Sequence, residues 1–189
     1  MNQNGFYSVE ELKNMGVTVY GKNIYVSTFC RIYNPKNLIL HDHIRIDDFT
    51  IISCKGPVEI FNYVHIASSC LISCSTRIII SDFAGISAGV KLFGGSDDYS
   101  GKFLTNPMVP TKYTNVKKGD IILEKHALVG ANSVILPDVI LKEGTSVGAL
   151  SLINKTTDEW KVYAGVPARV IKDRHKDCLL LEKEFLDSL

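Results

Sequence analysis

Apolar residues recur at every sixth position along most of this chain. From Tyr20 they form triplets that each begin twenty residues after the last, and after an interruption the pattern resumes at Leu123 with eighteen residues per triplet. The register positions are Tyr20, Val26, Ile32, Leu40, Ile46, Ile52, Ile60, Ile66, Ile72, Ile80, Ile86, Leu92, Leu123, Val129, Ile135, Leu141, Val147 and Ile153. A period of six fits neither an amphipathic helix nor a simple β-strand, but it is typical of short strands joined by tight turns, with three strands closing one coil.

A second position in each hexad is restricted in size. Four residues after most register positions stands a small or β-branched side chain, and these are Cys30, Thr50, Val64, Cys70, Thr76, Ala84, Val90, Ala127, Ser133, Thr145, Ser151 and Thr157. Successive coils would stack at roughly 4.8 Å, so each register residue lies above its counterpart in the next coil. The pattern predicts an all-β fold, a parallel β-helix with coils over 20–92 and 123–157. A sandwich of short strands is the alternative, but it has no reason to keep a six-residue register this long.

The segments outside the register predict three further features of one domain, 1–189. Ser8 followed three residues later by Glu11 is a capping box, which predicts a short helix over 8–16. The hexads lapse over 93–122, and a loop of this length in a compact domain is usually functional. Apolar residues among charges predict a C-terminal helix over 170–189 that covers an end or flank of the coils.

Composition narrows the range of partners and compartments. A net charge of +1 gives no field that attracts nucleic acid or an anionic membrane. The segment 1–5 lacks the features of a signal peptide, and the apolar runs are too short or too interrupted for membrane insertion, so we expect a cytoplasmic protein. Five cysteines without a C-x-x-C spacing indicate neither a disulfide framework nor a zinc site, so we interpret them as reduced thiols.

Three stretches carry a resemblance to a known family. They are Val-Gly-Ala-Asn-Ser-Val-Ile-Leu-Pro at 129–137, Val-Gly-Ala-Leu-Ser at 147–151 and Tyr-Ala-Gly-Val-Pro-Ala-Arg-Val-Ile-Lys at 163–172. With the repeat, they resemble the hexapeptide-repeat acyltransferases, in the branch of the galactoside, maltose and serine acetyltransferases and the sugar acetyltransferases of surface-polysaccharide pathways. The resemblance implies a left-handed β-helix, a homotrimer, acetyl-CoA as donor and active sites between subunits. The left hand comes from the resemblance alone, because parallel crossovers are generally right-handed.

The same stretches give the expected CoA site. Gly130, Ala131, Gly148 and Ala149 bring small residues to adjacent coils, which would make a bare strip for the pantetheine arm. A tight-turn requirement explains the glycines equally well. Three cations, Lys155, Arg169 and Lys172, would meet the CoA phosphates as the similar family positions do, with solvated surface charge as the alternative. Ser151 and Pro167 complete the expected CoA site.

The catalytic base is the point at which the chain departs from its family. In the galactoside-type enzymes a histidine in the loop serves this role, but a gap-free count places Asp97 at that position, followed by Asp98. His65 precedes Ile66 in the register and should point outward from the coils. We expect a trimer to bring His65 of one subunit against the loop of the next, where Asp97 or Asp98 would orient it. The alternatives are a surface histidine with an ordinary Asp-Asp turn, and an aspartate that acts alone as base.

The remaining candidate residues are assigned more simply. Four loop residues would line the acceptor pocket, with packing or solvent contacts as the alternative, and they are Tyr99, Phe103, Asn106 and Met108. His41, His43 and His126 fall at turn positions, where we expect solvated side chains, and His175 falls in the predicted C-terminal helix. No metal is expected, because a zinc site of the γ-carbonic anhydrase type needs three converging histidines that these spacings do not supply.

The expected function is transfer of an acetyl group from acetyl-CoA to a small-molecule sugar acceptor, in lipopolysaccharide or capsule biosynthesis. The acceptor would be a sugar hydroxyl or the amine of a nucleotide-linked amino sugar, and both stay open because both need the same base. A non-catalytic β-helix scaffold is one alternative, for which the missing loop histidine argues. An acyltransferase for a non-sugar small molecule is the other.

Overall fold

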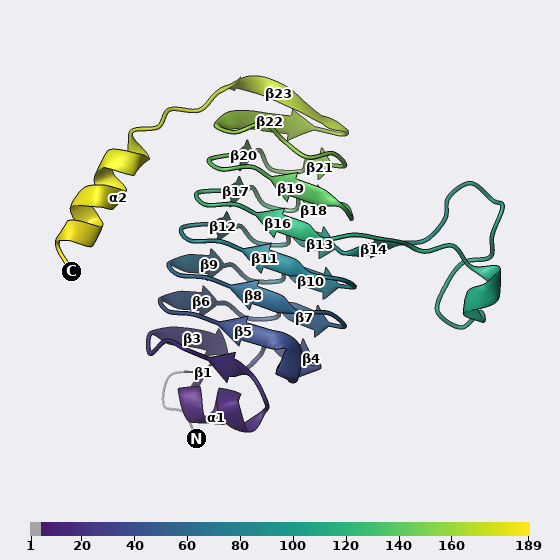
Figure 1. Cartoon of the computed structure of the whole chain (residues 1–189), viewed down its shortest axis with the longest axis horizontal. Coiled ribbons are helices and arrows are strands. Elements are labelled where there is room, and N and C mark those ends of the chain that lie inside the picture. The colour runs from purple at the N-terminus through teal and green to yellow at the C-terminus, as the bar shows by residue number, and fades with distance from the viewer. Residues whose placement is uncertain (1–4) are drawn as a thin grey trace.

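The chain winds into a left-handed β-helix with three flat sides (Figure 1). This computed structural model describes residues 5–189, so the first four residues of the segment inspected for a signal peptide lie outside the described part. The coils stack along one axis, with β3 near the N-terminal end and β22 near the other (Figure 1). In the described part, no helix is long and apolar enough to cross a membrane.

The first side, here called sheet A, has nine strands. Its members in spatial order are β1 (Phe6–Tyr7), β3 (Ile24–Ser27), β6 (Ile44–Ile46), β9 (Val64–Ile66), β12 (Gly85–Ile86), β17 (Leu128–Val129), β20 (Ser146–Val147), β22 (Lys161–Gly165) and β23 (Ala168–Asp173). The seven inner strands are parallel, whereas β1 pairs antiparallel with β3 and β23 pairs antiparallel with β22. Sheet A therefore ends in a reversed strand at each edge.

The other two sides, sheets B and C, have six parallel strands each. Sheet B consists of β2 (Thr18–Val19), β5 (Leu38–Leu40), β8 (Val58–Ile60), β11 (Ile78–Ile80), β16 (Ile121–Leu123) and β19 (Val139–Leu141). Sheet C consists of β4 (Arg31–Tyr33), β7 (Ile51–Cys54), β10 (Leu71–Cys74), β13 (Lys91–Phe93), β18 (Val134–Ile135) and β21 (Leu152–Ile153). A short 3₁₀ turn, Pro35–Asn37, precedes β5.

The predicted register forms the core. Every register residue from Leu40 to Ile153 is at most 2% exposed, and the pairings Ile46 with Ile66 and Leu123 with Leu141 keep the predicted spacings of twenty and eighteen. Two assignments were wrong. Tyr20 is 70% exposed, because one extra residue in the first coil lets Val19 take its place beside Leu40. Thr76 is exposed, because the turn between sheets C and B is two residues longer in the twenty-residue coils than in the eighteen-residue coil. Ile78 therefore faces the core in place of Thr76.

The N-terminal helix forms as predicted. α1 (Val9–Asn14) begins after Ser8, whose hydroxyl accepts the Glu11 N–H at 3.2 Å while the Glu11 carboxylate accepts the Ser8 N–H at 2.7 Å. Leu12 on this helix is fully buried and caps the core.

The C-terminal helix is shorter than predicted. α2 (Cys178–Asp187) begins eight residues after 170, because residues 168–173 form β23 against β22. His175 therefore lies in the link between β23 and α2 rather than in a helix. Figure 1 shows α2 along the side of the column, at the turns that enter sheet A.

α2 covers a histidine that was predicted to be solvated. His126 is 8% exposed, its Nε2 lies 2.7 Å from Glu182 Oε2 on α2, and its ring stacks on Phe83. His41 is half-buried and stacks on Phe61, and His43 is exposed as predicted. The prediction failed for His126 because a helix far along the chain packs over its turn.

The loop between β13 and β16 leaves the column as a stalk. β14 (Gly95–Ser96) and β15 (Lys117–Lys118) pair antiparallel at its base, and a 3₁₀ turn, Thr111–Tyr113, lies near its tip. Arg77 on the column pairs with Asp120 at 2.7 Å beside this base. Figure 1 shows the tip projecting well away from the coils of its own chain.

Candidate active site

A strip of small residues runs along the corner between sheets A and C. After five inner strands of sheet A, β6, β9, β12, β17 and β20, the chain turns, and the first residue after the strand donates its N–H to a carbonyl of the next coil. Ser87 donates to Val129 at 2.9 Å and Gly130 donates to Val147 at 2.7 Å. The strip consists of Ala67, Ser68, Ser87, Ala88, Gly130, Ala131, Gly148, Ala149, Ala164 and Gly165. The predicted four-residue strip thus spans five coils.

Close stacking of the coils explains the glycines of the strip. A Cβ atom on Gly130 would lie 2.6 Å from the Ala149 nitrogen and 2.7 Å from the Val147 oxygen. At Gly148 the nearest atom would be the Ala164 Cβ, at 3.1 Å. Close approach of the next coil, and not a positive φ, therefore explains the glycine at 130, and the same packing leaves the outer surface of the strip without large side chains.

Ser151 is turned into the column instead of toward the strip. It is 2% exposed, its hydroxyl accepts the Gly165 N–H at 3.1 Å, and its own N–H donates to Ser133 at 3.1 Å. Its position four residues after Val147 makes it one of the size-restricted inner residues. The Ser151 side chain is therefore not exposed to a ligand on the strip.

An open groove lies beside the strip at the C-terminal end. It has a volume of about 430 Å³ and is lined by Ile153, Asn154, Lys155, Thr156, Tyr163, Ala168, Arg169 and Val170. The structure thus brings together two of the three predicted phosphate-binding cations, Lys155 and Arg169, with Pro167 in the exposed turn between β22 and β23. Lys172 lines a different groove with Arg174 and His175, so it does not join them.

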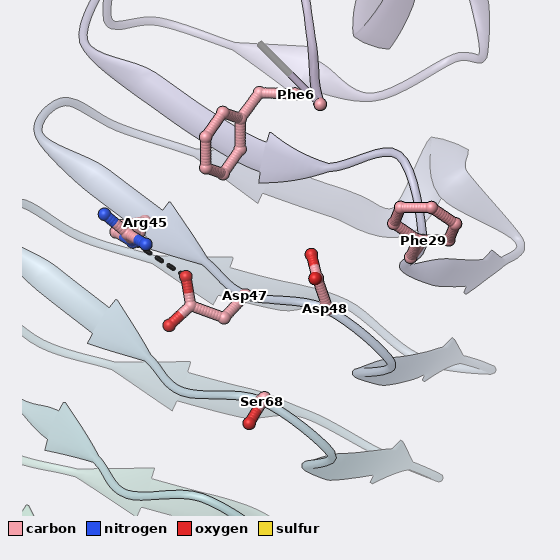
Figure 2. A pocket seen from close by; sticks show the side chains of 7 residues that line it. Phe6, Phe29, Arg45, Asp47, Asp48 and Ser68 are labelled. Carbon is pink, nitrogen blue, oxygen red and sulfur yellow. Dashed lines mark hydrogen bonds and ion pairs between the residues drawn. The ribbon is translucent and has the colours of Figure 1, made fainter.

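A second pocket, here called the N-terminal pocket, lies at the opposite end of the strip. It has a volume of about 410 Å³ and is lined by Gly5, Phe6, Phe29, Arg45, Asp47, Asp48 and Ser68 (Figure 2). Ser68 belongs to the strip, so the pocket and the strip are continuous. Sequence reasoning missed this pocket, because its walls come from β1 and from three successive coils.

His65 points outward as predicted, and its partner is in its own chain. The side chain is 53% exposed, and Nε2 lies 2.8 Å from Asp47 Oδ2, while Arg45 Nε contacts the other carboxylate oxygen at 2.7 Å. Burial raises the pKa of Asp47, but the hydrogen bonds from His65 and Arg45 outweigh it and hold that pKa below its ordinary value. The register pairs Arg45 with His65, so the twenty-residue repeat could have pointed to Asp47, two residues further on.

The predicted loop residues lie on the stalk and its tip. Asp97 is exposed just after β14, and Asp98 accepts the Ser100 N–H at 2.8 Å and an Asn115 N–H at 3.3 Å. A hydrogen bond from the Ser100 hydroxyl, with these two, lowers the pKa of Asp98. Within residues 5–189 of one chain, neither aspartate hydrogen-bonds to His65, so a meeting of His65 with the loop needs a second copy.

The predicted acceptor-lining residues are open to solvent in the single chain. Tyr99 is 94% and Met108 90% exposed, and Phe103 is 43% exposed. Asn106 has a positive φ of 73° and accepts the Met108 N–H at 3.0 Å, so it shapes the turn at the tip. Exposed aromatic and apolar side chains on a projecting loop are a surface suited to contact with another molecule.

The cysteines and the residue types that bind metals are the remaining reactive side chains. All five cysteines are free in the described part, and burial raises the pKa of Cys30 to about 11 and that of Cys54 to about 12. The thiols of Cys30 and Cys54 are therefore protonated at neutral pH. Between residues 5 and 189 no group of three or more His, Cys, Asp or Glu side chains is placed to hold a metal ion.

Comparisons with known proteins agree on one class of enzyme, although no family model matches the chain. The chain is 38% identical over 179 residues to the dTDP-4-amino-4,6-dideoxy-D-glucose acyltransferase of Escherichia coli, which covers 94% of this chain and 93% of that one. It is 28% identical over 147 residues to the putative lipopolysaccharide biosynthesis O-acetyl transferase WbbJ of E. coli K12, covering 74% and 70% of the two chains.

A solved structure matches the whole chain. The N-acyltransferase AntD of Bacillus cereus, in complex with dTDP and coenzyme A, superposes with a TM-score of 0.95 at 42% identity and covers 100% of both chains. Other AntD structures hold dTDP-4-amino-4,6-dideoxyglucose with coenzyme A, or dTDP with 3-hydroxybutyryl-CoA. Some carry a replaced serine, and others a replaced aspartate ten residues further along. The described fold and these similarities show that the chain is an enzyme and belongs to the hexapeptide-repeat, left-handed β-helix acyltransferases.

Proposed function

We propose that this enzyme transfers an acyl group from a CoA thioester to the amine of a dTDP-linked 4-amino-4,6-dideoxyhexose. The observation that carries the proposal is the full-length similarity to AntD, which holds both a dTDP-amino sugar and coenzyme A. The product, an N-acylated deoxysugar nucleotide, would serve surface-polysaccharide assembly. Both co-substrates are metabolites of the cytoplasm, which supports the location expected from the sequence.

The strip and the C-terminal groove would hold the donor. The pantetheine arm is extended and carries amide groups, and a strip without large side chains lets it lie against the backbone of successive coils. Lys155 and Arg169 would pair with the phosphates at the groove, Arg169 as a planar fork that matches phosphate oxygens. The thioester then lies toward the middle of the strip, near Ser87.

Ser87 and Asp97 would face the reacting atoms. They stand ten residues apart, the spacing of the serine and aspartate replaced in AntD. The amine attacks the thioester carbonyl, a C–N bond forms, the C–S bond breaks and the amine loses a proton. A carboxylate at Asp97 can accept that proton or hold the amine in position.

The site would be shared between protomers of a homotrimer. The stalk that begins with β14 projects from its own column (Figure 1), Asp97 directly follows β14 on it, and Tyr99 and Met108 further along the loop are almost fully exposed. A neighbouring copy placed against the tip would cover these side chains and receive Asp97 beside its own strip. The closed symmetry that the family resemblance implies would repeat this site three times.

Release of free CoA tests the proposed function. The enzyme is mixed with acetyl-CoA or 3-hydroxybutyryl-CoA and with dTDP-4-amino-4,6-dideoxyglucose, and the thiol is measured with DTNB. We expect thiol release with the amino sugar and none above background with dTDP-glucose, which offers hydroxyl groups but no amine. The similarity to WbbJ favours O-acetylation as the second candidate, and equal release with both sugars would support it.

A further inference from the structure

The N-terminal pocket has two aromatic walls. Phe29 is 64% exposed, and its ring lies 5.8 Å from that of Phe49, which is 63% exposed. Phe6 on β1 forms the opposite wall, with the Arg45 guanidinium 5.6 Å from its ring. Figure 2 shows Phe6 and Phe29 on the two sides of the opening. Exposed flat rings of this kind are platforms on which a planar heteroaromatic group stacks.

The edge of the pocket offers a carboxylate and a hydroxyl group. Figure 2 shows Asp48 between the two walls, with Ser68 on the next coil. The Ser27 hydroxyl donates to Asp48 Oδ1, and this is the only side-chain hydrogen bond of the Asp48 carboxylate within the described residues. Asp47, in contrast, already accepts bonds from Arg45 and His65. Oδ2 of Asp48 is thus available to a ligand N–H, and Ser68 can donate or accept beside it.

The distance along the strip fits the far end of a nucleotide sugar. The coil of Ser87 lies two coils from that of Asp47 and three from that of Ser27 in sheet A. At about 4.8 Å per coil, the pocket is roughly 10–14 Å from Ser87, where the acceptor amine is placed. A hexose joined through a diphosphate to a deoxyribose spans a distance of this order, so its base falls at the pocket.

We propose that the N-terminal pocket selects the base of the acceptor nucleotide, with Asp48 as the residue that reads a pyrimidine N3–H and Phe29 as the stacking platform. The inference rests on the proposed function and adds the residues that determine base specificity. Thymine carries a proton on N3, which the Asp48 carboxylate accepts. Cytosine presents an unprotonated N3 at the same place, so two acceptors face each other and dCDP binds more weakly than dTDP.

Asp48→Asn tests the reading of the base. Asparagine keeps the shape, can still accept the Ser27 hydroxyl proton and adds an N–H₂ donor. Calorimetric titration of the full chain with dTDP and with dCDP gives the two Kd values. We expect the native protein to bind dTDP more tightly than dCDP. Asp48→Asn should raise the Kd for dTDP about ten- to hundredfold and reduce the difference between the Kd values for dTDP and dCDP.

Phe29→Ala tests the platform, with Tyr20→Ala as its matched control. Tyr20 is 70% exposed at a different corner of the column, so its loss should leave both affinities unchanged. Phe29→Ala should weaken dTDP and dCDP alike, about tenfold, because stacking does not discriminate between pyrimidines. Thermal unfolding of each variant checks that the coils remain intact.

Two outcomes separate this inference from the function on which it rests. If the native enzyme acylates the dTDP-amino sugar but Asp48→Asn keeps the native dTDP to dCDP ratio, the pocket is not the base site and the proposed function stands. If the native enzyme binds neither nucleotide and releases no CoA with the amino sugar, both are overturned.

Discussion

At the scale of single residues, Gly130 marks the closest approach of two coils at the strip. We expect Gly130→Ala to lower the free energy of unfolding by about 1–3 kcal/mol, because the added methyl group meets backbone atoms of the next coil that have no room to move. Urea unfolding followed by circular dichroism measures the change.

Gly85→Ala is the matched control for this variant. Its Cβ would meet only the end of the Leu128 side chain, at 3.1 Å, and that side chain can shift. The free energy of unfolding should change by about 0.5 kcal/mol or less. Equal losses at both glycines would mean that backbone freedom, and not the close stacking of coils, explains the glycine at 130.

Asp97 and His65 make different predictions for catalysis. If Asp97 takes the amine proton, Asp97→Asn lowers kcat about 10²- to 10⁴-fold and changes the KM for acyl-CoA little. His65→Gln should then lower kcat less than tenfold, because that ring pairs with Asp47 on the column. Steady-state rates measured with DTNB give the loss of kcat for each variant. A larger loss for His65→Gln than for Asp97→Asn would assign the role of base to His65.

The register predicted the direction in which a side chain points better than the residue that it contacts. It placed His65 outward correctly, because apolar spacing fixes which residues face the core. It did not give Asp47 as the partner, since the reach of a side chain across coils is not encoded in hydrophobic spacing. Ser151 shows the reverse error: the family motif suggested a CoA contact, although its place in the register already predicted an inward side chain.

At the scale of elements, α2 is held against a column of stacked rings. Tyr63, Phe83 and His126 stack on successive coils, and Phe185 of α2 meets the first two edge to face at 5.3 and 6.4 Å. Glu182 adds contacts to Lys125 at 2.5 Å and to His126 at 2.7 Å. One acidic residue therefore connects the helix to the coils.

Glu182→Gln should loosen α2 in a pH-dependent way. Burial raises the pKa of Glu182, but the bonds from Lys125 and His126 outweigh it and hold that pKa below its ordinary value. A carboxyl group whose pKa is lowered by folding stabilises the fold at a pH above its pKa in the unfolded chain. This contribution is lost as the pH falls through its pKa in the folded protein. In urea unfolding at pH 7, we expect the free energy of unfolding of the native protein to be about 1 kcal/mol higher than that of Glu182→Gln.

The same comparison repeated in steps toward pH 3.5 checks the sign. The difference between the two proteins should shrink as Glu182 becomes protonated, and a difference that grows in acid would contradict this account. Glu184→Gln on the exposed side of α2 serves as the control and should show little difference at any pH.

The stalk should be separable from the column. Replacing residues 98–115 with a short Gly-Ser turn leaves β14, β15 and the Arg77–Asp120 pair in place, so the thermal midpoint should stay within a few degrees. CoA release should fall to background, because the exposed tip is lost. Retained activity would show that the tip takes no part in the site.

Elements with local signals were predicted and elements that depend on distant pairing were not. The coils and α1 follow from the hexad period and the Ser8 capping box. β23 was assigned to a helix, because Val170 and Ile171 among charges fit either structure and only pairing with β22 decides. The N-terminal pocket was not predicted because it also depends on distant pairing: β1 lines it only by pairing antiparallel with β3.

At the scale of the whole molecule, the proposed sharing of the site between the protomers of a trimer predicts complementation. Asp97→Asn removes the loop contribution, and Ala149→Trp fills the strip, so each should be inactive alone. Co-expressed with different tags and purified as mixed trimers, they should recover about one third of native activity, because one of three sites then combines an intact strip with an intact loop. A mixture that stays inactive would place the whole site within one chain.

The reversed strands at the two ends of sheet A limit how the molecule can associate. β1 is only two residues long, and half of the residues in β23 are charged. A very short edge and a charged edge are both poor templates for another chain's backbone. The columns should therefore not join end to end into filaments, and copies of this protein are left to meet through their sides, where the strip and the projecting loop are found.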